Sequence, residues 1–155
     1  MTNSHAEVLL SVRNLVKNFE LRANSGIRKT QRIVQAVADV SFDVKVGQTL
    51  GLVGESGSGK TTVGRSVLQL IQPTSGEVIF EGEDLTKMSF EELRHVRRQI
   101  QIVFQDPFAS LDPKMTVGSS IAEPLVVQGV GGNHQDKVAE LLDLVGLATD
   151  HAKRF

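Results

Sequence analysis

Eight residues, Gly54–Thr61, combine glycines, a lysine and a hydroxyl at a spacing suited to phosphate chemistry. They fit the pattern G-x-x-x-x-G-K-[ST] without departure. Glycine lets the backbone turn tightly and approach a ligand without a Cβ in the way, so that successive N–H groups converge on an anion. A helix starting directly after the loop points its positive end at the same place. The pattern predicts a phosphate-binding loop (P-loop) made by Gly54, Glu55, Ser56, Gly57, Ser58, Gly59, Lys60, Thr61 and Thr62.

The side chains at the end of this loop indicate which phosphate ligand it holds. Lys60 places a full positive charge between the β- and γ-phosphates, and Thr61 offers a hydroxyl to a magnesium shell of hard oxygen ligands. Thr62 can hydrogen-bond the α-phosphate. The alternative is a flexible glycine-rich turn with a surface lysine, and the apolar segment before the loop and the helical pattern after it favour phosphate binding. We therefore expect ATP with Mg²⁺ as the ligand.

Gln105 and Asp106 are the next polar residues that follow an apolar run, Ile100–Phe104. One interpretation makes Asp106 a carboxylate at the end of a buried strand that binds magnesium. A second makes Gln105 a polar group at a strand tip that reaches the metal or the attacking water. A third makes Asp106 only a cap before Pro107. The pattern alone leaves these three open.

The elements that must position these residues follow from hydrophobic periodicity and turn signals. We predict extended segments at Val8–Phe19 and Ile33–Val46, a solvated basic loop at Leu21–Arg32, and a strand at Thr49–Val53 that leads into the P-loop. A helix should run from near Gly59 to before Pro73, with Val63, Val67, Leu68 and Ile71 as its buried stripe.

Further along the chain, strand and helix signals alternate and then give way to helices. We predict strands at Glu77–Phe80 and Ile100–Phe104, a helix opened by a capping box at Ser89 and ending near Arg98, and helices at Val117–Val127 and Gln135–Val145. In the last of these, Val138, Leu141, Leu142 and Val145 share one face. The order predicts a β-rich front, an α/β nucleotide-binding centre and a helical tail.

Composition narrows the function classes. The 155 residues are 40% hydrophobic and 23% charged, which is ordinary for a globular domain. The chain has no cysteine, so disulfides and thiolate metal sites are excluded. The net charge of −1 and the absence of interleaved aromatic residues around the basic cluster Arg94, Arg97 and Arg98 give no indication of nucleic-acid binding. The four scattered histidines have no ligand spacing.

Three segments carry a family resemblance. Val53–Thr62, Pro73–Glu77 and Ile102–Pro113 resemble the ATP-binding subunits of ABC transporters, and the stretch after Gln105 resembles those that energise oligopeptide and dipeptide import. Thr116-Val117 and Ile121–Leu125 continue the match. The resemblance extends from about Val8 to Phe155.

The resemblance implies roles for single residues and for partners. Gln105 becomes the Q-loop glutamine that senses magnesium and the γ-phosphate, so the implied catalytic residues are Lys60 and Gln105 and the implied metal contacts Thr61 and Gln105. Asp106–Thr116 lies where the family docks its membrane-spanning permease subunits. Phe19 takes the place of the aromatic residue that stacks on adenine; Phe42 is the other candidate and is interpreted as a core residue. A second ATP-binding subunit and a position on the cytoplasmic side of the membrane are also implied.

The same resemblance predicts an incomplete α/β P-loop NTPase fold of the ABC ATPase type. We expect an N-terminal antiparallel β subdomain with the P-loop strand (8–53), a nucleotide-binding part with the Q-loop (54–111) and the start of a helical subdomain (112–155). The Walker B aspartate, the adjacent glutamate, the signature and the switch histidine of the family do not occur in the sequence. We therefore expect a truncated transport ATPase that is inactive alone. The alternatives are a non-catalytic nucleotide-binding fragment, a P-loop kinase, or a GTPase, against which the missing Asn-Lys-x-Asp motif counts.

Overall fold

The structure is a computed structural model that describes residues 7–25, 28–106 and 110–155. Within these ranges, the side chains between positions 22 and 31 are not described. Two parts of the sequence-based expectations therefore lie outside the described residues: positions 26 and 27 in the predicted loop, and positions 107–109 in the segment Asp106–Thr116. The chain forms two compact units, the first ending at Gln101 and the second beginning at Ile102. The predicted subdivision at 53/54 and 111/112 stays a prediction.

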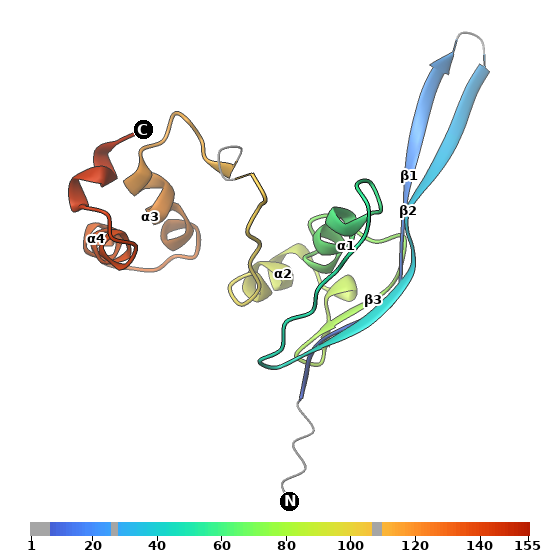
Figure 1. The fold of residues 1–155 in the computed structure, drawn as a ribbon, viewed down its shortest axis with the longest axis horizontal. Coiled ribbons are helices and arrows are strands. Elements are labelled where there is room, and N and C mark those ends of the chain that lie inside the picture. The colour runs from blue at the N-terminus through green and yellow to red at the C-terminus, as the bar shows by residue number, and fades with distance from the viewer. Residues whose placement is uncertain (1–6, 26–27, 107–109) are drawn as a thin grey trace, which may run out of the picture. The chain divides into compact units, whose positions relative to one another are not determined.

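An antiparallel sheet of four strands, in the order β2-β1-β3-β4, forms the base of the first unit (Figure 1). The strands are β1 (Val8–Ser25), β2 (Arg28–Lys45), β3 (Ser75–Phe80) and β4 (Glu83–Asp84). β1 and β2 pair along their whole length, whereas β3 pairs with β1 only between Leu10 and Val16. The outer part of β1 and β2 is therefore a two-stranded ribbon that extends beyond the sheet.

Two short helices and a 3₁₀ turn accompany this sheet: α1 (Lys60–Val67), η1 (Leu85–Lys87) and α2 (Phe90–Val96). Helix α1 contributes Val63 and Val67 to the core. The predicted capping box is confirmed, because the Ser89 Oγ accepts from the Glu92 N–H and the Glu92 carboxylate accepts from the Ser89 N–H. The buried core of the unit consists of Val12, Leu15, Val37, Val63, Val67, Val78, Phe80 and Leu85.

The regular secondary structure described in the second unit is helical. It includes α3 (Val117–Val127), α4 (His134–Leu144) and the 3₁₀ segment η3 (Thr149–Lys153). Thr116 and Asn133 cap α3 and α4 with their side chains. Val138 and Leu142 are the buried apolar residues of α4, which confirms half of its predicted stripe, whereas Val145 is exposed. No helix in the described ranges has the length and apolar character needed to cross a membrane.

The predicted loop Leu21–Arg32 is wrong. β1 continues to Ser25 and β2 begins at Arg28, with the pairs Leu21–Arg32 and Ser25–Arg28 at the two ends of this stretch. Polar residues do not prevent such a ribbon, because antiparallel pairing satisfies the backbone N–H and C=O groups there. Charge patterning therefore did not predict the backbone of this segment.

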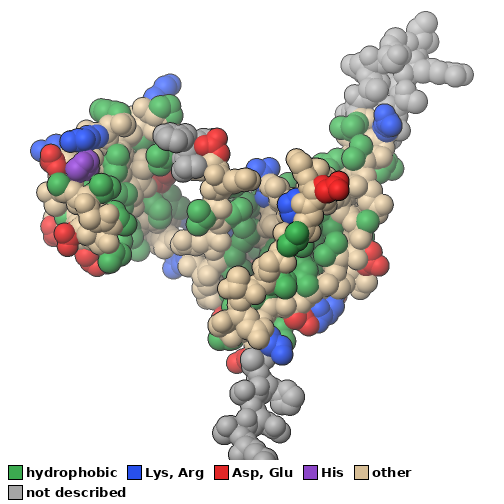
Figure 2. All heavy atoms as spheres, viewed as in Figure 1, with side chains coloured by type: hydrophobic (Ala, Val, Ile, Leu, Met, Phe, Trp, Pro, Cys, Tyr) green, Lys and Arg blue, Asp and Glu red, His purple; other side chains and the backbone are tan. Residues whose placement is uncertain are grey.

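The predicted strands Thr49–Val53 and Ile100–Phe104 also do not form. A strand is stabilised by hydrogen bonds to a neighbouring strand, and neither segment belongs to the described sheet. Their apolar side chains are open to solvent: Val53 is 93% exposed and Val103 is 97% exposed. Figure 2 shows many hydrophobic side chains at the surface of both units, in line with these values.

Helix α1 is shorter than expected because its end folds back on itself. The predicted helix reached Pro73, whereas α1 ends at Val67. Gln69 adopts the left-handed conformation, with φ of 52°. The N–H groups of Leu70 and Ile71 both donate to the Arg65 carbonyl, at 2.9 and 3.3 Å. This wrapped end satisfies carbonyls that a helix terminus leaves free.

Candidate functional site

The P-loop leads directly into α1, and Gly59 is the residue before the first helical turn. Its φ of 92° lies in the left-handed region. A Cβ at this position would collide with the carbonyl oxygen of Ala36 in β2. A Cβ on Gly54 would lie 2.6 Å from the Ser58 Oγ. Glycine is thus required at position 59, where the loop lies directly against the β2 backbone, whereas the contact at position 54 is with a side chain that can rotate.

Lys60 carries the charge of this loop. Its Nζ donates to the carbonyl oxygens of Gly54 and Glu55 at 2.7 and 2.6 Å, and it lies 3.4 Å from the Ser58 Oγ. The ammonium group is therefore folded back over the loop that it follows in sequence. Thr61 and Thr62 occupy the first turn of α1, where Thr61 is exposed and Thr62 half-buried. One ammonium, one exposed hydroxyl and a helix N-terminus meet here, which is a donor set suited to a phosphate chain and a hard cation.

A cavity of about 490 Å³ lies between the P-loop and β2. Its walls include Gly57, Ser58 and Val63 on one side and the β2 residues around Val34 and Val37 on the other. The sequence analysis did not predict the β2 contribution. The signal that could have revealed the β2 contribution is the register of the β1–β2 hairpin. The sequence analysis treated part of this hairpin as a loop, so the position of β2 beside the P-loop was not expected.

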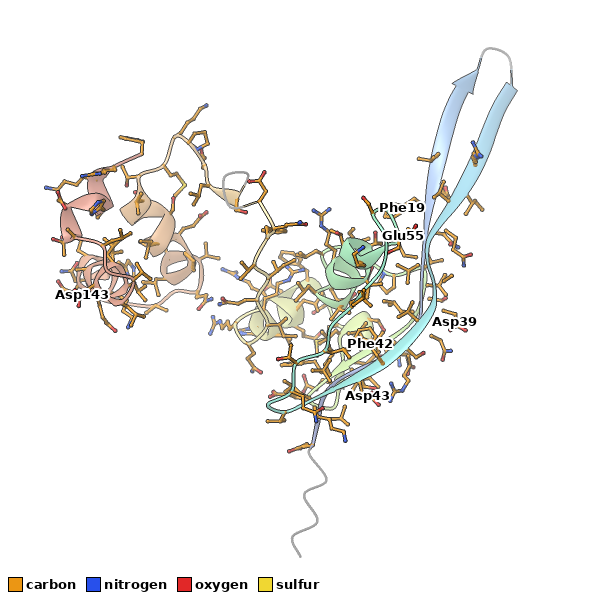
Figure 3. All side chains as sticks on the ribbon, viewed as in Figure 1. Phe19, Asp39, Phe42, Asp43, Glu55 and Asp143 are labelled. Carbon is orange, nitrogen blue, oxygen red and sulfur yellow. The ribbon has the colours of Figure 1, made fainter. Side chains whose placement is uncertain are left out.

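The register of the two strands pairs Phe19 with a residue of this cavity wall. Phe19 is paired with Val34, which lines the cavity, and its side chain is 37% exposed. Figure 3 shows Phe19 on β1 and Glu55 in the loop that precedes α1, both in the first unit. Phe42 instead packs against the buried core, as the sequence analysis interpreted it. The stacking role of Phe19 stays a prediction, and its position is compatible with that role.

Lys17 was missed by the sequence analysis. Its Nζ lies over the Phe19 ring, 5.2 Å from the ring centroid, and donates to the Gln72 carbonyl at 2.7 Å. The alternation of side chains along a strand puts residues i and i+2 on the same face, so the spacing of Lys17 and Phe19 is the signal that could have revealed the contact.

Gln105 belongs to the second unit, where it occupies an exposed bend after the unpaired segment that ends at Phe104. Asp106, which follows it, is exposed as well. Phe19, the β2 cavity wall and the P-loop thus belong to the first unit. Gln105 belongs to the second unit. The metal and catalytic roles of Gln105 and Lys60 stay predictions. In the ranges 7–25, 28–106 and 110–155, no group of three or more acidic or histidine side chains is arranged to hold a metal.

Two carboxyl groups with displaced pKa values, those of Asp43 and Asp84, belong to strands of the sheet. A hydrogen bond from Ser11, together with the ion pair to Arg13 at 2.7 Å, lowers the pKa of Asp43. Burial raises the pKa of Asp84, but hydrogen bonds from Lys87 and Thr86 outweigh it, so the pKa of Asp84 is lowered. These groups lie on β1, β2 and the β4–η1 turn, and we assign them to structure.

Comparison with known proteins identifies the class that this fold and loop define. A family model described as "ABC transporter" matches residues 37–155, so the chain belongs to the ABC transporter family. The resemblance seen in the sequence is confirmed, and so is the fold class.

Relatives in the family are identical to this chain at about half of the aligned positions. It is 47% identical over 154 residues to the glutathione import ATP-binding protein GsiA of Pectobacterium atrosepticum, covering 98% of this chain and 25% of that protein. It is 50% identical over 151 residues to GsiA of Escherichia coli K12, covering 96% of this chain and 24% of that protein. The chain therefore spans about a quarter of the length of these curated relatives.

Solved structures give the same fold. A dimeric ATP-binding cassette, MJ0796, in a post-hydrolysis state bound to ADP and Pi matches with a TM-score of 0.72 and 25% identity, over 94% of this chain and 60% of that one. The cassette cbiO1 from Clostridium perfringens, part of the transporter complex cbiONQ, matches with a TM-score of 0.64 and 22% identity, over 96% of this chain and 53% of that one. The second likeness, at this identity, concerns the fold alone.

Proposed function

We propose that this chain binds Mg²⁺-ATP as part of the ATP-binding subunit of an ABC importer. The observation that carries the proposal is the P-loop, in which the Lys60 ammonium lies over the loop carbonyls and the loop forms one wall of the cavity of about 490 Å³. Loop N–H groups and the start of α1 hold the phosphates. The remainder of the cavity has room for the nucleoside.

Each predicted residue has a part in this proposal. Lys60 exchanges its loop carbonyl partners for phosphate oxygens, a stronger charge-assisted interaction. Thr61 is exposed and offers its hydroxyl to magnesium, whose preference is for oxygen ligands. Phe19 stacks on the adenine ring, and Gln105 acts as the Q-loop glutamine that senses magnesium. Magnesium, when bound, neutralises charge on the phosphates.

The solute and the partners are proposed from the relatives. GsiA proteins are named for glutathione import, which supports a small peptide as the transported solute. The dimeric state of the MJ0796 cassette supports a second ATP-binding subunit as a partner. Membrane-spanning permease subunits would contact Asp106–Thr116, which puts the protein at the cytoplasmic side of the membrane.

ATP hydrolysis is proposed as the activity of the family's whole subunit. The second candidate function is a nucleotide-binding module without turnover. Negligible phosphate release from saturating Mg²⁺-ATP favours this candidate, whereas turnover that is lost in Lys60→Ala favours a complete ATPase.

Ligand-induced stabilisation tests the binding proposal. A ligand that binds only the folded state raises stability by about 2.7 kcal/mol at a concentration 100 times its Kd. Thermal unfolding of the chain should therefore shift to higher temperature with Mg²⁺-ATP and not with adenosine at equal concentration. If Mg²⁺-ATP produces no shift at any concentration up to about 10 mM, well above ordinary nucleotide affinities, the proposal is wrong.

A further inference from the structure

The Lys17 side chain makes two contacts at once. Its Nζ lies 5.2 Å from the centroid of the Phe19 ring and 2.7 Å from the carbonyl oxygen of Gln72. A cation over the face of an aromatic ring is attracted by the ring quadrupole. The backbone carbonyl fixes where that cation lies, so the two contacts together restrict the orientation of the ring.

The segment that contains Gln72, whose carbonyl accepts from Lys17, is hydrogen-bonded to β1. The Thr74 N–H donates to the Val16 carbonyl at 2.8 Å, and the Asn18 N–H donates to the Thr74 Oγ1 at 2.9 Å. These bonds join the segment after α1 to the strand that carries Lys17 and Phe19. The position of the ammonium over the ring therefore depends on backbone contacts and not on a freely moving side chain.

An aromatic ring has two faces, and Lys17 covers only one of them. Phe19 remains 37% exposed, and its pairing partner Val34 lines a cavity that also contains Gly57 and Ser58 of the P-loop. A nucleobase stacked on the uncovered face would meet a ring that is already oriented. Ordering a side chain before binding lowers the entropic cost of binding.

From these contacts we propose that Lys17 is a positioning residue for the nucleobase: it holds the Phe19 ring from one face so that the other face is presented to the base of the bound nucleotide. This inference rests on the proposed function, because it requires a nucleotide at the P-loop. It assigns Lys17 to recognition of the base and not of the phosphates.

Calorimetric titration of the chain with two probes separates these roles. The probes are Mg²⁺-ATP and Mg²⁺-tripolyphosphate, which share phosphates but not the base. Lys17→Met should weaken ATP binding about three- to tenfold and leave tripolyphosphate binding unchanged. Lys17→Arg keeps a cation and a donor and should bind ATP like the wild type. Lys17→Gln keeps a donor for the Gln72 carbonyl but no charge, and it should weaken ATP binding by a similar factor. It provides the test if the Lys17→Met variant does not fold.

The Phe19 ring provides the sharpest control. In a Phe19→Leu background, Lys17→Gln should have no further effect on ATP affinity, because the ring through which it acts is gone. Lys45→Met removes an exposed lysine at the far end of β2 and should change neither affinity.

Three results overturn the inference in distinguishable ways. Unchanged ATP affinity in both Lys17→Met and Lys17→Gln removes the positioning role and leaves the proposed function intact. An equal loss of ATP and tripolyphosphate affinity assigns Lys17 to the fold of the P-loop. A wild-type chain that binds neither probe contradicts the proposed function, and the inference fails with it.

Discussion

Gly59 is the residue where the P-loop is most closely packed, and replacing it with alanine tests how the loop is built. The new Cβ would meet the carbonyl oxygen of Ala36, a backbone atom that cannot rotate away. The φ of 92° adds a second cost, since the left-handed conformation disfavours residues with a Cβ by about 1–2 kcal/mol. With the steric contact included, we expect Gly59→Ala to lower the free energy of unfolding by about 2–4 kcal/mol. ATP affinity should fall too, because relief of the contact moves the loop away from β2.

Gly64 is the matched control, five residues further on in α1. A Cβ added there meets nothing within 4 Å, and the residue is in an ordinary helical conformation. Gly64→Ala should therefore stabilise the chain by about 0.5–1 kcal/mol, the difference between glycine and alanine in a helix. Urea unfolding of both variants, followed by titration with Mg²⁺-ATP, measures these effects. If Gly59→Ala unfolds at the same urea concentration as Gly64→Ala and binds ATP equally well, the described packing of the loop on β2 is refuted.

Two further predictions concern the elements that support the loop. Ser89→Ala should lower the free energy of unfolding by about 0.5–2 kcal/mol, because the Ser89 Oγ accepts the Glu92 N–H at 3.3 Å. Ser89→Gly should lower it by only a few tenths of a kcal/mol. Equal stability of Ser89→Ala and wild type in urea would contradict the capping box. Asp84 forms an ion pair with Lys87 at 2.7 Å, and its pKa is lowered in the folded chain. The Asp84 carboxylate therefore stabilises the folded chain above the unfolded pKa of about 3.9, and this contribution is lost as the pH falls through the lower folded pKa. Asp84→Asn should therefore be about 1 kcal/mol less stable than wild type at pH 7, and the difference should shrink in urea unfolding below about pH 4; a difference that is the same at every pH would contradict the assigned ion pair.

Local signals in the sequence predicted some elements well. The capping box at Ser89 and the helix Val117–Val127 need only residues close in the chain, and both are found where the sequence placed them. The motif Gly54–Thr61 predicted a loop that opens a helix for the same reason. The family resemblance, which depends on the order of such short segments, is confirmed by the comparisons.

Elements that depend on distant partners were predicted less well. The apolar run Thr49–Val53 has strand composition, but composition cannot tell whether another strand lies beside it. The polar stretch Leu21–Arg32 has loop composition, but pairing between its two halves makes it a ribbon. The β2 wall of the cavity depends on this pairing, whereas the contact of Lys17 with Phe19 follows from their i, i+2 spacing along β1. Register, and not residue type, was the missing information.

The central claim is that Lys60 in the P-loop binds the phosphates of ATP, and calorimetric titration of Mg²⁺-ATP into wild type and Lys60→Ala tests it most directly. We predict that Lys60→Ala weakens binding at least about tenfold, the size expected for a hydrogen bond to a charged group, and that the control Lys45→Ala binds like the wild type. Urea unfolding of both variants shows that the comparison is made between folded chains. A Lys60→Ala chain that is folded and binds Mg²⁺-ATP within about twofold of the wild type, well inside the effect of one such bond, would contradict the assignment of this loop.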